Sequence, residues 1–90
     1  MTILLLGENS IGEDGAKAIA EALKVNPVLT SLELGGNRLI GDDGAKAIAE
    51  ALKVNPVLTK LDLKYNLLGE AGEKAVRDAV KDRSGFVLEL

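Results

Sequence analysis

The 90-residue chain contains no cysteine, no histidine and no tryptophan, and its aromatic residues are one tyrosine and one phenylalanine. These absences exclude disulfides, cysteine–histidine and serine–histidine catalysis, the usual zinc sites and haem ligation by histidine. No apolar run approaches the ~18 residues of a membrane span, and Ile3–Leu6 is too short for a secretory signal. The missing cysteines favour a reducing, cytoplasmic setting.

Acidic residues slightly outnumber basic ones, 14 to 11, for a net charge of −3. This balance argues against a nucleic acid or an anionic membrane as partner. Hydrophobic residues make up 47% and charged residues 28%, which is typical of a globular domain rather than a disordered chain. We expect one domain over residues 1–90, with no cofactor and no metal ion.

An internal repeat dominates the sequence. Residues 15–30 and 44–59 are identical, GAKAIAEALKVNPVLT, at an offset of 29. Such a period indicates a repeat architecture, with units at 1–28, 29–57 and 58–84 and a partial terminal unit at 85–90. Leucines and glycines keep nearly the same spacing in every unit: Leu4, Leu32, Leu61 and Leu88; Leu6, Leu34, Leu63 and Leu90; Gly15, Gly44 and Gly72.

Each unit has two halves with different periods. The first half, L-x-x-L-x-L-x-x-N, alternates apolar and polar residues at its centre, which predicts a short strand. The second half, Gly44–Lys53, is rich in alanine and places Ile48 and Leu52 four apart, which predicts a helix with a narrow apolar stripe. Asn-Pro pairs at 26–27 and 55–56 are expected to end these helices.

The alternation of strand and helix predicts the architecture. A strand, a helix and a return form a right-handed crossover, so successive strands pair in parallel. One unit cannot bury both its strand leucines and its helix stripe, but stacked units can. Helices are also wider than strands, at about 10 Å against about 4.8 Å, so the stack curves. We expect an α/β right-handed solenoid, a horseshoe segment with an inner parallel sheet of about four strands and about three outer helices.

The motif L-x-x-L-x-L-x-x-N, followed by x-[IL]-G-[DE]-x-G-A, resembles the ribonuclease-inhibitor-like class of leucine-rich repeats over almost the whole chain. The same class occurs in activators of Ran-type GTPases and in nucleotide-binding leucine-rich-repeat receptors. The resemblance implies a horseshoe and a protein-binding surface, and it leaves the partner open. Two departures stand out. One extra residue between Asn37 and Gly44 predicts a local bulge near Ile40, and the last return, 81–86, lacks Asn-Pro.

Asn9, Asn37 and Asn66 follow successive strands at the same position. An asparagine side chain inside a turn satisfies backbone donors and acceptors that would otherwise be buried without partners. We therefore expect a structural ladder rather than a set of ligand-binding amides.

Several polar residues of the strands are candidates for a binding surface on the concave face. Glu33 and Asp62 fall on adjacent strands about 5 Å apart, close enough for a glycosidase acid pair or a calcium site. We favour a solvated face instead, because nothing excludes water from an open sheet and lysines lie close enough to neutralise the carboxylates. A Ser31–Lys60 nucleophile is a remote alternative. The protein-binding candidates are Ser31, Glu33, Lys60, Asp62, Lys64 and Tyr65.

Tyr65 is the most informative single side chain. It precedes Asn66, at the position that Gly36 occupies in the second unit. There it either projects from the inner rim, where tyrosine is a common binding residue, or lies over the neighbouring strand.

Two functions fit these features. The first is a protein–protein interaction module that binds through its concave face. The second is a repeat scaffold with no evolved partner, which is either designed or consensus-like or a fragment of a longer array. An enzyme fits least, because the sequence offers no pocket chemistry.

The outermost strands predict self-association. Ile3 and Leu5 lie on an apolar first strand without charge, and Phe86 and Val87 form a second apolar patch on the last strand. An exposed edge of this kind is a template for strand pairing. We expect a homodimer through the first strand with two-fold symmetry and antiparallel edges, with a head-to-tail stack as the alternative.

Overall fold

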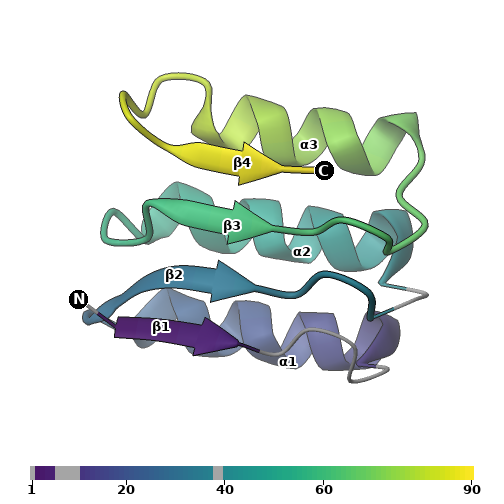
Figure 1. The fold of residues 1–90 in the computed structure, drawn as a ribbon, viewed down its shortest axis with the longest axis horizontal. Coiled ribbons are helices and arrows are strands. Elements are labelled where there is room, and N and C mark those ends of the chain that lie inside the picture. Colours follow the sequence, from purple (N-terminus) through teal and green to yellow (C-terminus); the bar gives the residue numbers. More distant parts are fainter. Residues whose placement is uncertain (1, 6–10, 38–39) are drawn as a thin grey trace.

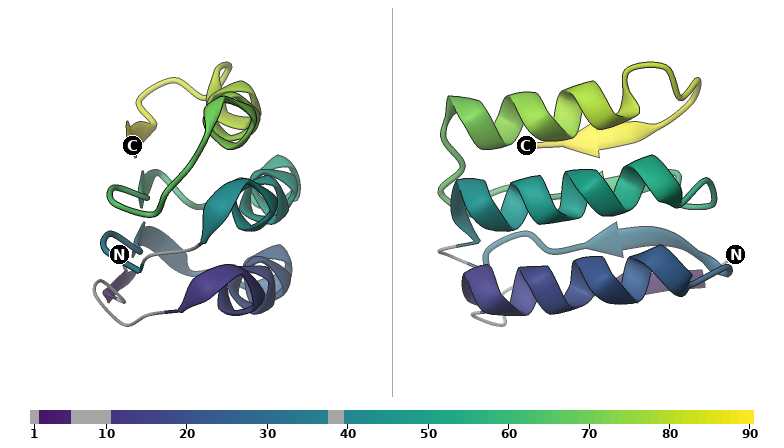
Figure 2. Two further views of the ribbon diagram at one scale, coloured as in Figure 1. Left: turned by 90° about the vertical axis from the view of Figure 1, so that its right-hand side faces the viewer. Right: turned by 180° about the vertical axis from the view of Figure 1, so that it is seen from behind.

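The computed structural model describes residues 2–5, 11–37 and 40–90, with side chains from Ile11 onward. A layer of strands lies against a layer of helices, and the units are stacked side by side (Figures 1 and 2). The elements alternate along the chain: β1 (Thr2–Leu5), α1 (Gly12–Val25), β2 (Leu29–Glu33), α2 (Gly41–Val54), β3 (Lys60–Asp62), α3 (Glu70–Val80) and β4 (Val87–Glu89).

The four strands form one parallel sheet in the order β1-β2-β3-β4. Leu4, Leu32, Leu61 and Leu88 share one register position across it. Sheet order equals chain order because every strand returns through a helix on the same face (Figure 1). The predicted α/β solenoid with a parallel sheet is therefore confirmed.

Glycine marks the start of the first two helices. Gly12 and Gly41 have φ of 72° and 65°, in the left-handed region that favours glycine. The helices begin there, so α2 starts three residues before the predicted Gly44. The third helix starts differently: the Asp42 carboxylate accepts hydrogen bonds from the backbone N–H groups of Gly69 and Gly72, at 2.6 and 3.1 Å.

The helices end where the Asn-Pro pairs predict. Asn26 and Asn55 are the first residues beyond α1 and α2, and both have extended backbones. An extended residue before proline avoids the clash that a helical one would meet, so the chain turns back toward the sheet.

The core lies between the two layers. Its strand side is built from leucines such as Leu32 and Leu61, which are fully buried, and Ile48 contributes from α2. Small residues bring neighbouring helices together: a Cβ added to Gly44 would lie 3.1 Å from the Ala16 Cβ of α1. A larger side chain at Gly44 would therefore push α1 and α2 apart.

Two predictions concern residues outside the described part of the chain. Asn9, the first member of the expected ladder, is one of them. The bulge expected from the extra residue of the second unit falls at residues 38–39, directly before Ile40, which is fully buried.

Candidate protein-binding surface

The turns after β2 and β3 are held by two asparagines. Asn37 and Asn66 are buried, and the backbone N–H of Asn37 donates to Oδ1 of Asn66 at 3.0 Å. The Asn66 Nδ2 donates to the carbonyls of Leu34 and Leu63 at 2.8 and 3.0 Å, and the Asn37 Nδ2 donates to Leu34 at 2.7 Å. Two of these bonds, from Asn37 to Asn66 and from Asn66 to Leu34, connect neighbouring units, and the other two hold each turn to its own strand. The turns that follow the strands are therefore rigid supports for the surface beside them.

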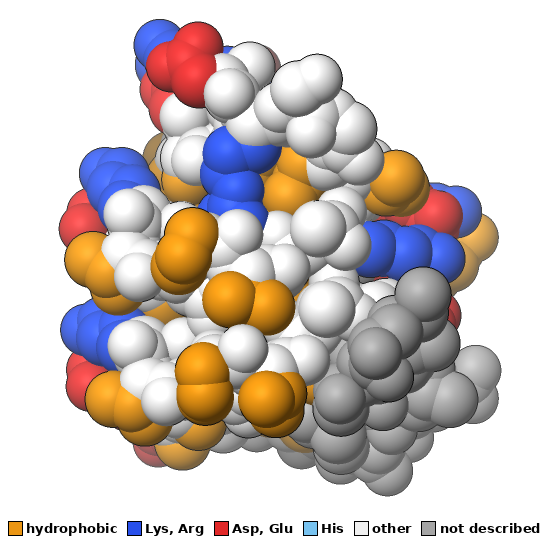
Figure 3. Space-filling view, turned by 90° about the vertical axis from the view of Figure 1, so that its left-hand side faces the viewer, with side chains coloured by type: hydrophobic (Ala, Val, Ile, Leu, Met, Phe, Trp, Pro, Cys, Tyr) orange, Lys and Arg blue, Asp and Glu red, His pale blue; other side chains and the backbone are white. Residues whose placement is uncertain are grey.

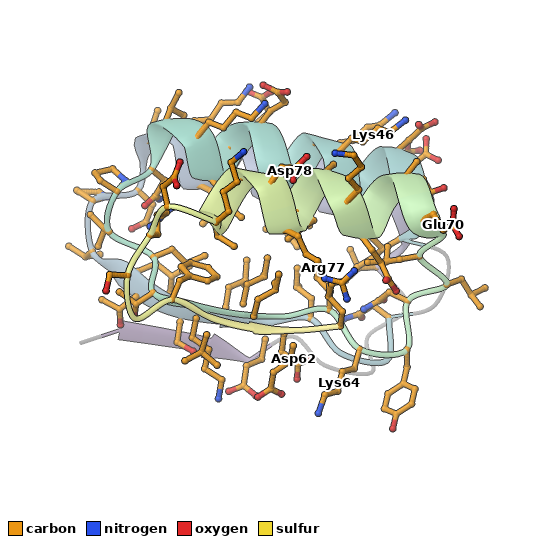
Figure 4. The ribbon with its side chains drawn as sticks, turned by 90° about the horizontal axis from the view of Figure 1, so that it is seen from above. Lys46, Asp62, Lys64, Glu70, Arg77 and Asp78 are labelled. Carbon is orange, nitrogen blue, oxygen red and sulfur yellow. The ribbon has the colours of Figure 1, made fainter. Side chains whose placement is uncertain are left out.

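A column of carboxylates crosses the sheet beside these turns. Glu33, Asp62 and Glu89 share one register position on β2, β3 and β4, and all three are half-buried. Asp62 and Lys64 point away from the helix layer, on the face of the sheet opposite the described helices (Figure 4). We call this the open sheet face.

Lys64 balances part of this charge. Its Nζ lies 3.3 Å from the Glu89 carboxylate, and its backbone N–H donates to Asp62 Oδ1 at 2.9 Å. The hydrogen bond to Glu89 is the main reason why the pKa of Lys64 is raised above its ordinary value. The open sheet face is therefore a mosaic of both signs with its carboxylates partly neutralised.

Ser31 differs from the other candidates. It shares a register position with Ile3 on one side and Lys60 on the other, and it is only 7% exposed. Among the described residues its Oγ has no hydrogen-bond partner, so it does not pair with Lys60 as a nucleophile would. Ser31 therefore presents little surface to a partner, because a short side chain between two neighbouring strands is covered.

Tyr65 stands out from the turn after β3. Its side chain is 84% exposed. This exposure excludes the alternative in which the ring lies over the neighbouring strand. Its φ of 61° is in the left-handed region, as is the φ of 73° at Gly36 in the second unit. An L-residue with a bulky side chain is strained there, so the backbone of this turn is set by the ladder and not by the tyrosine.

Leu67 was not singled out from the sequence and belongs to the same feature. Its φ is 57° and it is 71% exposed, on the other side of the buried Asn66. The two exposed side chains border a hollow of about 190 Å³, which is also lined by Leu63, Asn66, Leu68, Glu73 and Leu90. The sequence held one signal of this exposure. Tyr65 and Leu67 stand in the turn at the positions that Gly36 and Arg38 hold in the second unit.

A family model described as leucine-rich repeat matches the chain over residues 1–20, 25–49 and 54–75. The chain belongs to the leucine-rich repeat family. The match is compatible with the ribonuclease-inhibitor-like class that the motif resembles. No curated protein matches the chain. Leucine-rich repeats generally mediate protein–protein interaction and are typically non-enzymatic scaffolds.

This leucine-rich repeat protein has a further buried amide, Asn55, at the opposite turns, where sequence reasoning predicted only a helix end. Asn55 is 3% exposed, and its Nδ2 donates to the carbonyls of Leu23 and Asn26 in the preceding unit at 2.7 and 3.3 Å. Its Oδ1 accepts from the backbone N–H groups of Val57 and Leu58 at 2.8 and 3.0 Å. The Asn-Pro repeat therefore links units as well as ending helices.

Arg83 performs this linking role in the third unit, which lacks Asn-Pro. Its guanidinium donates to the carbonyls of Leu52, at 3.0 Å, and Leu58. The same group lies 5.0 Å from the centre of the Phe86 ring. Burial is the cause of the lowered pKa of Arg83.

The two predicted self-association patches lie at the first and the last strands of the sheet. Phe86 is half-buried: it packs against the core and lies beneath Arg83, so part of its side chain is exposed beside Val87. Val87 is 48% exposed. Ile3 and Leu5 lie on β1, which pairs with β2 and is the first strand of the sheet.

The edge that carries the helix-to-strand turns is apolar in the first two units. Hydrophobic side chains gather over it, while charged side chains replace them at the third unit (Figure 3). A hollow of about 230 Å³ lies between the two turns, and its apolar lining is Val25, Pro27, Val54, Pro56 and Val57.

Within the described residues, no three histidine, cysteine or acidic side chains lie close enough together to hold a metal ion. No helix among them is long and apolar enough to span a membrane.

Proposed function

We propose that the chain is a protein–protein interaction module, one domain of three units and a partial fourth, which binds its partner through the open sheet face and the Tyr65 turn. The observation that carries the proposal is Tyr65, an exposed aromatic side chain on a left-handed backbone. Such strain lowers stability, and it is common where function requires a particular side chain. Tyrosine also contributes a large contact area at low cost in conformational entropy.

The surroundings of Tyr65 suit a protein partner. Leu67 extends the apolar contact, while Lys60, Lys64, Glu33 and Asp62 supply both signs of charge along the strands. A centre of exposed apolar side chains beside a polar surround is the usual composition of a protein interface. An open sheet with partly neutralised carboxylates offers no means of excluding water, so we propose no enzymatic activity.

Affinity capture from a lysate of the source cells tests this proposal with a pair of variants. Tyr65→Asn removes the ring, and asparagine tolerates the left-handed backbone, so the fold is expected to be kept. Val28→Asn is the matched control, because Val28 is also an exposed apolar residue but lies on the opposite edge, at 59% exposure. We expect the wild type and the Val28 control to capture a stoichiometric partner. The amount of this partner captured by the Tyr65 variant should be at least tenfold lower.

Two outcomes contradict the proposal. A partner that both variants bind equally would move the site away from Tyr65. The absence of any stoichiometric partner would favour the repeat scaffold without an evolved partner.

Three finer properties belong to the same proposal. We propose a cytoplasmic location, on the ground that the chain has no cysteine. We propose that the partner is a protein rather than a nucleic acid or a membrane, because the net charge is −3. We also propose that the chain forms a homodimer through the first strand, since β1 is an edge strand.

A further inference from the structure

Two neighbouring carboxylates on the open sheet face are not neutralised by an ion pair. Glu33 on β2 and Asp62 on β3 share one register position, and both are half-buried. The ammonium of Lys64 lies 3.3 Å from Glu89, on the strand beyond Asp62. Lys60 lies on β3 itself, but among the described residues no ion pair joins it to either carboxylate. We call Glu33 and Asp62 the carboxylate pair.

The backbone holds Asp62 close to the unit of its neighbour. Asp62 Oδ1 accepts the backbone N–H of Lys64 at 2.9 Å, which fixes the carboxylate at the end of β3. A Cβ added to Gly35, just after β2, would lie 3.4 Å from Asp62 Oδ2, so glycine leaves the room that this carboxylate occupies. Neighbouring strands are about 4.8 Å apart, so one cationic group is large enough to contact both members of the carboxylate pair.

A buried hydroxyl beside the carboxylate pair is an independent sign of a polar ligand. Ser31 precedes Glu33 by two residues on β2, so the two side chains leave the same face of the strand. Ser31 is only 7% exposed, and within the described part of the chain its Oγ has no hydrogen-bond partner. Buried polar atoms are nearly always hydrogen-bonded. Since Ser31 lies between Ile3 and Lys60 in the sheet, the narrow end of a long side chain reaches it more easily than a broad group.

The carboxylate pair lies on the two inner strands of the sheet. β2 and β3 are each paired on both sides, in the order β1-β2-β3-β4. A strand added at either edge would lengthen the sheet and would not lie over its face. Asp62 points away from the helix layer (Figure 4). A ligand therefore approaches the carboxylate pair from the side of the sheet opposite the described helices.

A guanidinium group suits this arrangement better than other cations. It is planar, always charged and carries five N–H donors, so it can donate to two carboxylates and a hydroxyl at once. A lysine ammonium has three donors at a single point and matches paired carboxylates less well. A metal ion is disfavoured, because no three histidine, cysteine or acidic side chains of the described residues are placed to hold one.

We propose that the carboxylate pair and Ser31 bind an arginine side chain of the protein partner. This inference rests on the proposed function and deepens it, because it names the side chain that the open sheet face recognises. Tyr65 and the arginine then have separate roles: the tyrosine supplies apolar contact area, and the arginine fixes the partner's orientation along the strands. Arginine is among the residues that contribute most to the affinity of protein interfaces.

A titration of the full chain tests the arginine site without knowledge of the partner. The probe is the Nα-acetyl amide of arginine, followed by amide chemical shifts in the NMR spectrum. We expect a dissociation constant in the millimolar range, with the largest shifts around Ser31, Glu33 and Asp62. The corresponding derivative of citrulline has a similar shape without the charge and should bind at least tenfold more weakly. The lysine derivative should bind at least threefold more weakly.

A double variant removes both charges of the site. In Glu33→Gln with Asp62→Asn, the amide oxygen at position 62 can still accept the Lys64 N–H, and we expect the affinity for the arginine probe to fall at least tenfold. Asp43→Asn with Asp82→Asn is the matched control, because it changes the net charge equally at exposed residues of α2 and of the return before β4. The control should keep the affinity of the wild type.

A circular-dichroism melt checks that each variant is folded. If the double variant is not, Glu33→Gln alone replaces it, since the Glu33 carboxylate makes no hydrogen bond or ion pair with the described residues. An arginine affinity that the variant leaves unchanged, or that citrulline or lysine equals, overturns the arginine site.

The same variants in the affinity capture separate this inference from the proposed function. A partner that is lost with Tyr65→Asn but kept by the carboxylate variant overturns the arginine contact and leaves the proposed function. Loss of the partner with both variants, and not with the control, supports the two together. Binding of the arginine probe without any captured partner overturns the claim that a protein supplies the arginine, and it contradicts the proposed function as well.

Discussion

Residues 15–30 and 44–59 have the same sequence and a different degree of burial. Ile48 is fully buried and Ile19 is only half-buried, and Asn55 is buried while Asn26 is not. Local propensity and side-chain volume are equal in the two segments, so the neighbouring unit accounts for the difference. In this solenoid a residue is therefore stabilised by the unit before it as well as by its own unit, which is the behaviour of a one-dimensional array.

Truncation of the paired isoleucines has the largest expected effect. Ile48→Ala leaves a cavity between α1, α2 and the sheet, and we expect it to lower the free energy of unfolding by about 2–5 kcal/mol. Ile19→Ala removes a half-exposed side chain, so we expect a loss of about 1 kcal/mol or less. Urea denaturation at a concentration that keeps the chain monomeric measures both. Equal losses would contradict the role of the neighbouring unit.

Variants of the paired asparagines Asn26 and Asn55 distinguish the contribution of hydrogen bonds within a turn from that of hydrogen bonds between units. Asn55→Ala removes the bonds to Leu23 and Asn26 as well as those within its own turn, and we expect a loss of about 2–3 kcal/mol. Asn26→Ala removes only bonds within the turn, with an expected loss of about 1 kcal/mol. The same denaturation measurement applies, and an Asn26 variant as unstable as the Asn55 variant would argue that the inter-unit bonds contribute nothing.

Arg83 extends the comparison to the third unit, where an arginine rather than an asparagine donates to the preceding unit. Arg83→Ala leaves the carbonyls of Leu52 and Leu58 without their donor, so we expect a loss of about 1–3 kcal/mol. Arg83→Lys should recover little of it, since one ammonium does not reproduce the planar fork of two donors. Thermal melts of the two variants check this. If Arg83→Lys were as stable as the wild type, a positive charge alone would be enough to link the third unit to the second.

The smallest expected effect is on the surface of α3. Lys74 lies 2.8 Å from Asp78, and this hydrogen bond is the main cause of the lowered pKa of Asp78. A carboxyl whose folded-state pKa is lowered stabilises the fold above its unfolded pKa, and this contribution is lost as the pH falls through the folded pKa. Asp78→Asn should therefore lower Tm slightly at neutral pH and not at all in strong acid, because the pair is exposed and screened. A Tm difference that grows in acid would be the opposite of this expectation.

Much of the fold could be predicted because leucine, glycine and Asn-Pro spacings report the repeat directly. The parallel register of Leu32 with Leu61 follows from that period. The burial of Ser31 and the packing of Phe86 could not be predicted, because they depend on which side chains lie beside them in other units. Arg83 was missed for the same reason, since its role is visible only once Leu52 and Leu58 present their carbonyls to it.

The candidate site was predicted less completely. The alignment of Tyr65 with Gly36 places it in a turn but leaves open whether its ring projects or lies over the neighbouring strand. Its left-handed backbone accompanies the bonds that Asn66 makes to the strands, which no local pattern reveals. Leu67 shares this dependence, and the available sequence signal was its alignment with Arg38 of the second unit.

Residue-resolved amide hydrogen exchange across the two identical segments tests the central claim most directly. Intrinsic exchange rates depend on local sequence, so within 15–30 and 44–59 any difference in rate reports structure alone. On the monomeric chain we predict slower exchange throughout Ala45–Leu52 than at the matching residues Ala16–Leu23. Equal protection in the two segments, or stronger protection in the first, would contradict the claim that each unit is stabilised by the one before it.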